Sequence, residues 1–111
     1  MSIKKIESKE DWNKLITEEE TFFIMKNSVT CPVSSEAFTE MESYAKSEPP
    51  FPIFYLNVQD LKELSNQISE ECNIKHESPQ VLLFHKNDVV WNASHWKVTK
   101  KNAEKASNEI A

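Results

Sequence analysis

A cysteine followed directly by a proline, Cys31-Pro32, is the pair in this sequence best suited to nucleophilic chemistry. The stretch from Thr30 to Ser34 follows an apolar run and opens a helical pattern. Proline is favoured at the first helical position, because its missing N–H would be unpaired there. Cys31 would then lie at or beside the N-cap, where free N–H groups and the helix dipole favour the thiolate. The thiolate is the nucleophilic form, so we expect Cys31 to be exposed and reactive rather than an ordinary buried cysteine.

Ser34 occupies the position that a second cysteine would hold in a Cys-x-x-Cys motif. On a helical wheel it falls beneath the apolar arc of Val33, Ala37 and Met41, so we expect it to point inward, below Cys31. A hydroxyl group there can donate a hydrogen bond to a thiolate, but it cannot form a disulfide. The sequence therefore predicts a one-cysteine mechanism, in which an external thiol resolves any adduct on Cys31. A capping bond from Ser34 to a free helix N–H is compatible with this role.

Polar residues in the neighbouring loops are expected to complete the site. Lys26 ends the apolar run before the cysteine, and we expect it to line the cleft beside Cys31 and to add positive charge there. Ser78-Pro79 precedes a later apolar run, in a loop that should face the cysteine. Two histidines in loops are expected to line or flank the same cleft: His76 and His95.

The remaining chemical groups are interpreted as structural. Cys72 shares a helical stripe with Leu61, Leu64 and Ile68, which indicates core packing rather than a second reactive thiol. Two cysteines are too few for a disulfide framework, and the spacing contains no zinc motif. Nothing in the pattern brings the three histidines (His76, His85 and His95) together, so we expect no metal site.

Length and composition restrict the function further. The chain has 111 residues, 39% of them hydrophobic, which is typical of one globular domain. Its net charge of -5 disfavours nucleic acid or an anionic membrane as a partner. It contains no glycine, which excludes glycine-rich phosphate and dinucleotide loops, and positions with positive φ are expected to use Asn or Asp. No signal peptide or membrane span is apparent, so we expect a cytoplasmic, monomeric protein with reduced thiols.

Hydrophobic periodicity predicts alternating helices and strands. Ser8 is expected to cap the first helix, Asn73 to end the third in a left-handed conformation, and Asn87-Asp88 to form a hairpin turn. The predicted elements are helices over about 9–18, 32–46, 60–72 and 99–110, and strands over about 21–25, 51–58, 81–84 and 89–91.

This order contains a β-α-β unit followed by a hairpin. The unit gives two parallel strands with a right-handed crossover, and the hairpin adds two antiparallel strands. The sequence thus predicts a mixed four-stranded sheet flanked by helices, an α/β layout like that of the thioredoxin fold, in a single domain over residues 1–111.

Three stretches resemble a known family, the monothiol bacilliredoxins of the bacillithiol redox system: 30–34 (TCPVS), 75–80 (KHESPQ) and 91–95 (WNASH). The resemblance spans nearly the whole chain, although members of the family often carry histidine at the position of Asn27. It implies a thioredoxin-like fold, a cis Pro79 and removal of bacillithiol from S-bacillithiolated client proteins. Cys31 would be the attacking residue and bacillithiol a co-substrate, with no bound cofactor. The residues expected to form the active site and bind the thiol are Thr30, Pro32, Ser34, Ser78 and Pro79.

Two other functions are compatible with the predicted fold. A thioredoxin-like domain can be a non-catalytic module that holds an extended peptide beside Ser78-Pro79, because fold does not determine function. Alternatively, Cys31 and an external thiol could hold an iron–sulfur cluster, as in a monothiol glutaredoxin. The lack of glycines that would let a cluster lie against the backbone disfavours the second alternative.

Overall fold

The strand β2 (Thr21–Asn27) is the central strand of a five-stranded sheet in the computed structural model, which describes residues 2–111. It pairs in parallel with β3 (Ile53–Asn57) and antiparallel with β4 (Gln80–His85). The edges are β1 (Lys4–Lys5), parallel to β3, and β5 (Asp88–Ser94), antiparallel to β4. Because β2 and β3 run in the same direction, the loops that follow them emerge at one end of the sheet.

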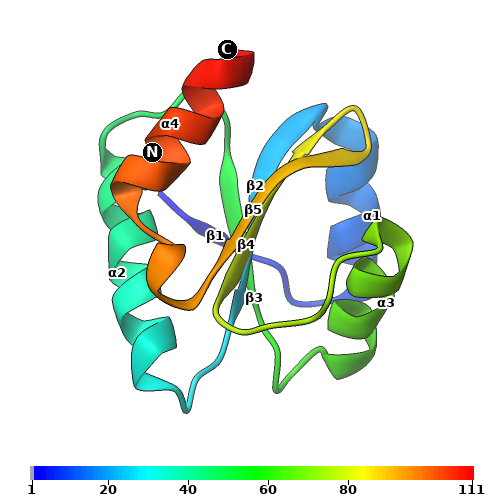
Figure 1. Cartoon of the computed structure of the whole chain (residues 1–111). Helices are drawn as coiled ribbons and strands as arrows, with labels where there is room; N and C mark the ends of the chain where they lie inside the picture. Colours follow the sequence, from blue (N-terminus) through cyan, green and yellow to red (C-terminus); the bar gives the residue numbers. More distant parts are fainter. Residues whose placement is uncertain (1) are drawn as a thin grey trace.

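Helices cover both faces of this sheet (Figure 1). On one face lie α2 (Pro32–Lys46) and α4 (Lys100–Ile110), together with the short helix η1 (His95–Lys97), which packs against α2. On the other face lie α1 (Lys9–Glu18) and α3 (Lys62–Cys72). This is the three-layer α/β arrangement that the sequence predicts.

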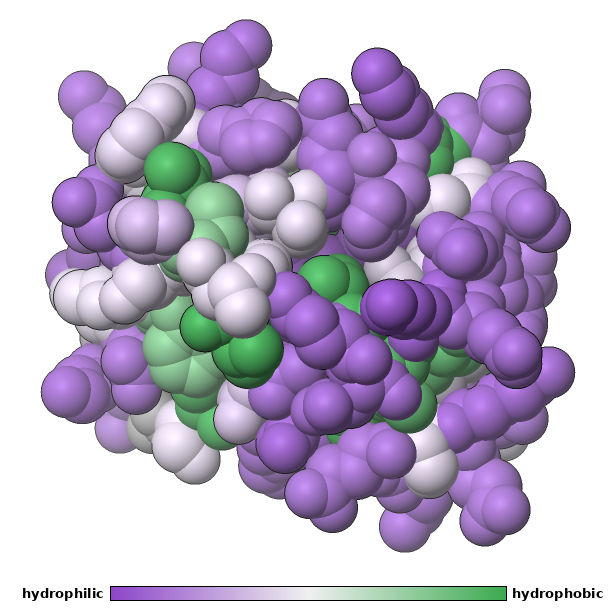
Figure 2. All heavy atoms as spheres, turned by 90° about the horizontal axis from the view of Figure 1, so that it is seen from below, coloured by the Kyte–Doolittle hydropathy of each residue, from purple (hydrophilic) through white to green (hydrophobic). Residues whose placement is uncertain are grey.

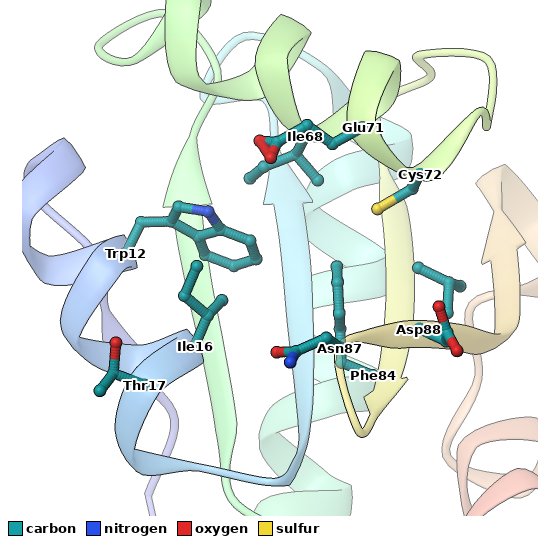
Figure 3. A pocket seen from close by; sticks show the side chains of 10 residues that line it. Trp12, Ile16, Thr17, Ile68, Glu71, Cys72, Phe84, Asn87 and Asp88 are labelled. Atoms are coloured by element: carbon teal, nitrogen blue, oxygen red, sulfur yellow. The ribbon is translucent and has the colours of Figure 1, made fainter.

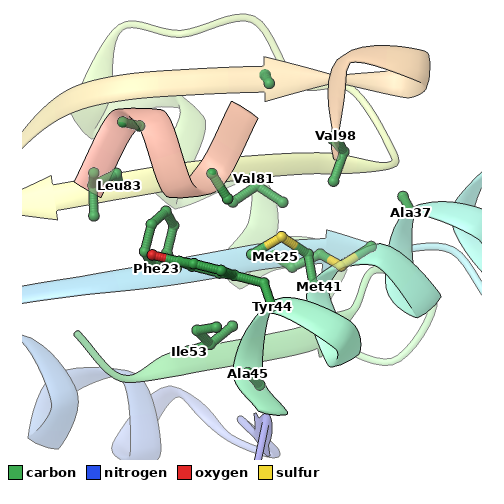
Figure 4. Close-up of a cluster of buried hydrophobic side chains, with 13 residues drawn as sticks. Phe23, Met25, Ala37, Met41, Tyr44, Ala45, Ile53, Val81, Leu83 and Val98 are labelled. Carbon is green, nitrogen blue, oxygen red and sulfur yellow. The ribbon is translucent and has the colours of Figure 1, made fainter. Parts of the chain in front are cut away.

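The central strand is buried on both faces, which explains its continuous apolar sequence. Phe23 and Met25 face α2, where they pack with Met41 and Tyr44 (Figure 4). The alternate residues of β2 face α1 and α3, in a second cluster that includes Phe22, Ile24, Trp12, Leu15 and Ile68. Two packed clusters thus hold the ends of β2 and β3 in fixed positions under the loops that follow them.

The prediction of four strands is wrong, because it missed β1. This strand has only two residues, both exposed lysines, and so it carries no apolar alternation that a pattern could detect. It is recognised by its backbone, which pairs Lys4 with Phe54 and Lys5 with Tyr55 at the edge of the sheet. Charged residues are typical of such edges, because they discourage pairing with a second sheet.

The helix caps and turns, which contain no glycine, agree in part with the predictions from the sequence. Ser8 caps α1 through a hydrogen bond that its hydroxyl oxygen accepts from the N–H of Asp11, and Asn73 ends α3 with φ 54°, as predicted. The hairpin turn lies one residue earlier than expected, at Lys86-Asn87. Positive φ is not confined to Asn and Asp as expected, because three other residues adopt it as well: Glu48, Lys86 and His95.

Within residues 2–111, no helix combines the length and the apolar character needed to cross a bilayer.

Candidate active site

Cys31 is the N-cap residue of α2, at the point where the chain leaves β2 and reverses direction. Pro32 takes the first helical position, as predicted, and the N–H of Ser35 donates to the Cys31 carbonyl oxygen at 3.2 Å. The cysteine itself is partly exposed and forms no disulfide. Its sulfur is therefore open to an incoming disulfide while its backbone is fixed by the helix.

Hydrogen-bond donors at the start of α2 lower the pKa of Cys31. The backbone N–H of Ser34 has the largest effect, and partial desolvation opposes it. The N–H of Val33 and the Ser34 hydroxyl lower the pKa further. Because these groups stabilise the charged form, a larger fraction of Cys31 is thiolate at neutral pH than in a free cysteine.

Ser34 lies where the sequence places it, pointing inward and completely buried. Its hydroxyl oxygen accepts a hydrogen bond from the backbone N–H of Ser28 at 3.2 Å, and the hydroxyl also acts on the Cys31 sulfur. The same side chain thus ties the β2–α2 loop to the helix and favours the thiolate.

Gln59 lies in the loop between β3 and α3 and forms hydrogen bonds with the loop between β2 and α2. We call this second loop, residues 28–31, the cysteine loop. The Gln59 amide oxygen accepts a hydrogen bond from the N–H of Val29 at 3.2 Å. Its amide nitrogen donates to the hydroxyl groups of Ser28 and Thr30 at 2.8 and 3.3 Å. The role of Gln59 was not predicted from the sequence. The signal that could have found it is the parallel pairing of β2 and β3, which brings the two following loops together.

The loop before β4 carries the expected cis peptide bond, between Ser78 and Pro79. Ser78 is partly exposed, and the Pro79 carbonyl oxygen accepts a hydrogen bond from the N–H of His95 at 2.9 Å. His95 and Trp96 line a hollow together with Val33 on the first turn of α2. His95 therefore flanks the cysteine helix and links it to the proline loop.

Lys26 does not line the cleft, contrary to the prediction. It shares the orientation of Phe22 and Ile24, so its side chain is completely buried on the α3 face of the sheet. There the ammonium group donates to the Ser65 carbonyl oxygen at 2.8 Å and to the Ser69 hydroxyl at 2.5 Å. Burial lowers the pKa of Lys26 to about 8, with a smaller opposing effect of Cys72.

His76 also lies on the α3 side rather than beside Cys31. Its Nδ1 is 3.3 Å from the ammonium of Lys26 and 3.2 Å from the Ser65 hydroxyl, and the rest of the ring is exposed. Burial, and then the charge of Lys26, lower the pKa of this imidazole. It lines a hollow with Gln59 and Ser65 that is separate from the hollow beside Cys31.

A hollow of 820 Å³ lies at the other cysteine (Figure 3). Cys72 ends α3 and faces Trp12, Ile16 and Phe84 across it, on the sheet face opposite to α2. Burial raises the pKa of Cys72, and the neighbouring Glu71 raises it further. Cys72 is thus a packing residue, as predicted, and the pKa values of the two thiols shift in opposite directions, downward for Cys31 and upward for Cys72.

Within residues 2–111, no three His, Cys, Asp or Glu side chains gather as metal ligands would. The site has one partly exposed cysteine, whose thiolate form is favoured by the N–H groups at the start of α2 and by the Ser34 hydroxyl. Such a group can attack a disulfide, and Ser34 cannot resolve the product.

Comparisons with known proteins identify the family of this chain. Residues 4–103 match the family described as monothiol bacilliredoxin BrxC. A solved structure described as a candidate oxidoreductase with a thioredoxin fold is 31% identical, with a TM-score of 0.87 over 94% of this chain and 92% of that one.

More distant structures show the fold alone. Thioredoxin from Plasmodium falciparum is 11% identical, with a TM-score of 0.80 over 97% of this chain and 99% of that chain. A mutant thioredoxin from Halobacterium salinarum is 8% identical, with a TM-score of 0.81 over 97% and 89%. With its thioredoxin fold and a match over nearly its whole length, this chain is a member of the monothiol bacilliredoxin family and has a role in thiol redox chemistry.

Proposed function

We propose that this protein removes bacillithiol from S-bacillithiolated cytoplasmic proteins by thiol–disulfide exchange through Cys31. The observation that carries the proposal is the position of its sulfur, at a helix N-terminus whose N–H groups lower the pKa. Family membership supports bacillithiol as the small thiol. No second thiol shares the site, because Cys72 lies on the opposite face of the sheet.

The reaction has two exchange steps. In the first, the Cys31 thiolate attacks the bacillithiol sulfur of the mixed disulfide, a Cys31–bacillithiol disulfide forms, and the client cysteine leaves as a thiolate. In the second, a free bacillithiol thiolate attacks the bacillithiol sulfur on Cys31. That step releases oxidised bacillithiol disulfide and restores the Cys31 thiolate. Each step breaks one disulfide and forms one, so no other oxidant or reductant is required.

Exposed apolar side chains support a protein as the client. Val29, in the cysteine loop, and Trp96, in η1, have exposed fractions of 61% and 68%. They lie on either side of the first turn of α2, because Val29 lines the hollow with Cys31 and Trp96 lines the one with Val33. Exposed aromatic and aliphatic groups around a reactive centre suit a protein surface better than a small molecule alone.

The test uses a purified S-bacillithiolated client and follows its release from bacillithiol by intact-protein mass. The wild type and Cys72→Ser are expected to restore the client thiol in the presence of bacillithiol. Cys31→Ser is expected to be inactive while retaining its circular dichroism and melting temperature. A Cys31→Ser protein that still restores the client would refute the proposal.

A further inference from the structure

One hollow lies directly beside Cys31, on the side of α2 that faces β3. Its volume is 430 Å³, and Cys31 is one of its lining residues. One wall is a stripe on α2 that continues from Cys31 through Ser35, Thr39 and Glu42. These positions follow one another along one side of a helix, so the stripe extends about 16 Å from the sulfur-bearing residue. We call this hollow the α2–β3 groove.

The opposite wall is formed by polar side chains at the ends of two strands. Asn27 ends β2 and Asn57 ends β3, and the two residues are paired in the parallel ladder. The Asn27 amide nitrogen donates to the Asn57 amide oxygen at 3.0 Å. This bond uses one donor of Asn27 and one lone pair of Asn57. The Asn27 amide oxygen and the Asn57 amide nitrogen have no other protein partner among residues 2–111, and both side chains are partly exposed.

An aromatic pair lies next to these amides. The rings of Phe38 and Tyr55 meet edge to face, with centroids 4.9 Å apart, and both rings are partly buried and line the groove. The groove thus combines an apolar ring surface with side-chain amides and hydroxyl groups. This combination suits a sugar ring, whose C–H face packs on aromatic carbon and whose hydroxyl groups bind planar amides in pairs.

The backbone of this groove does not favour an extended peptide. β1 pairs with β3 at Phe54 and Tyr55 only, but the backbone at the groove is used within the chain. The Asn57 carbonyl oxygen accepts from the N–H groups of Asp60 and Leu61, and the N–H of Val58 donates to the Asn27 carbonyl oxygen at 2.9 Å. A bound peptide would need free backbone groups to pair with, whereas the groove presents side chains.

We propose that the α2–β3 groove binds the hexosamine ring of bacillithiol, with the amides of Asn27 and Asn57 bonded to its hydroxyl groups. This inference rests on the function proposed above and adds the element that selects a sugar-bearing thiol over a peptide thiol. The cysteine of bacillithiol lies at Cys31, its sugar lies along α2, and its malate points into solvent, away from Glu42. The client occupies the other side of α2, where Trp96 and His95 lie.

This division lets both halves of a mixed disulfide contact the protein at once. Figure 2 looks onto the end of the molecule that carries the cysteine loop. Less hydrophilic side chains gather on the α2 side of this face, whereas hydrophilic ones dominate the α3 side. A client surface on one side of Cys31 and a sugar on the other would hold the scissile disulfide over the sulfur.

The test compares three disulfides: a bacillithiolated client, the same client carrying glutathione, and bis(2-hydroxyethyl) disulfide. Asn57→Ala and Asn27→Ala are expected to raise the KM for the bacillithiolated client roughly tenfold, the effect of one or two lost hydrogen bonds. Their kcat, and their rates with the other two disulfides, should stay within about twofold of wild type. Asn92→Ala is the matched control, because it removes an exposed amide from β5.

The conservative variant Asn57→Asp keeps the shape of the side chain if an alanine variant fails to fold. It is expected to raise the same KM, because a carboxylate cannot donate the hydrogen bond that the Asn57 amide gives to a sugar hydroxyl group. In Cys31→Ser protein, added bacillithiol should shift the side-chain amide resonances of Asn27 and Asn57, and glutathione should not.

The outcomes separate the two proposals. A wild type that reacts with none of the three disulfides refutes the proposed function, and the inference with it. A wild type that restores the bacillithiolated client while the asparagine variants keep its KM refutes the sugar subsite alone. The same conclusion follows if the variants lose activity equally toward all three disulfides.

Discussion

The Ser34 hydroxyl oxygen accepts a hydrogen bond from the backbone N–H of Ser28 at 3.2 Å, so one buried side chain joins the start of α2 to the loop that precedes Cys31. Accepting this bond leaves the hydroxyl hydrogen free for the Cys31 sulfur, which the group stabilises as a thiolate. Ser34, at the position of the second cysteine in a Cys-x-x-Cys motif, thus fixes the loop before Cys31 and lowers the pKa of the Cys31 thiol.

Replacing Ser34 by alanine should remove both the hydrogen bond with the Ser28 N–H and the stabilisation of the Cys31 thiolate. Ser34→Ala is expected to raise the pKa of Cys31, and the exchange rate at pH 7 should fall roughly fivefold as the thiolate fraction falls. It should also destabilise the fold by about 1 to 2 kcal/mol, since the Ser28 N–H loses its partner. The thiolate absorbance at 240 nm as a function of pH measures the first effect. Ser43→Ala, on the exposed side of α2, is the control, and an unchanged Cys31 pKa in Ser34→Ala would contradict the role of the hydroxyl.

A cysteine at the same position should change the product. Ser34→Cys places a second thiol one helical turn from Cys31, within reach of a disulfide. The bacillithiol adduct on Cys31 should then be released as free bacillithiol, with an intramolecular disulfide in its place. Intact mass spectrometry distinguishes the two: the wild type retains the bacillithiol mass, and the variant loses two hydrogens instead. If the variant keeps the adduct, the position does not face the reactive sulfur.

The buried ammonium of Lys26 makes stability depend on pH in a defined direction. Its pKa falls from 10.5 to about 8 on folding, so between these values the unfolded chain binds more protons. The contribution of Lys26 to stability therefore rises with pH across this interval, and its full penalty is present below pH 8. The groups that face it are Ser65, Ser69 and His76, with Cys72 nearby.

Removing that charge should stabilise the protein at neutral pH. In a Cys72→Ala background, which eliminates the coupled thiol, Lys26→Met is expected to raise the free energy of unfolding at pH 7 by about 1 to 2 kcal/mol. The gain should shrink between pH 8 and pH 10.5. Urea unfolding of both proteins at several pH values gives this difference directly. A gain that stays constant over that interval would show that Lys26 is not the titrating group.

Trp96 should contribute to the binding of protein clients and not to the reaction with small disulfides. Its side chain is 68% exposed, so Trp96→Ala is expected to leave the melting temperature nearly unchanged. A buried tryptophan contact in a complex is worth more than 1 kcal/mol, so the KM for a protein client should rise about tenfold. The rate with bis(2-hydroxyethyl) disulfide should not change. Val90→Ala, an exposed apolar residue of β5, is the control, and equal effects of the two variants would argue against a docking role.

Local signals predicted much of the fold. The apolar runs of β2, β3 and β4 identified the buried strands, and Asn73 marked the end of α3, because such patterns depend on neighbouring residues. β1 was not predicted, because it is defined by backbone pairing with residues 50 positions away in the sequence. The turn at Lys86 was misplaced by one residue, because a lysine gives no signal for a left-handed conformation.

The site was predictable only where one helix defines it. Cys31, Pro32 and Ser34 follow from the rules for helix N-termini. The position of Lys26 was predicted wrongly. The alternation along β2 shows that Lys26 and Ile24 point to the same face of the sheet, but it does not show which helix covers that face. Gln59 was missed because its role depends on the distance between two loops, which only the folded sheet determines.

The most direct test of the account is the location of the bacillithiol adduct after one turnover. The purified protein is mixed with an equal amount of S-bacillithiolated client, alkylated, digested without reductant and analysed by peptide mass. We predict that the added bacillithiol mass appears on the peptide containing Cys31 and that the Cys72 peptide is only alkylated. An adduct on Cys72, or a restored client with no adduct on either cysteine, would contradict the account.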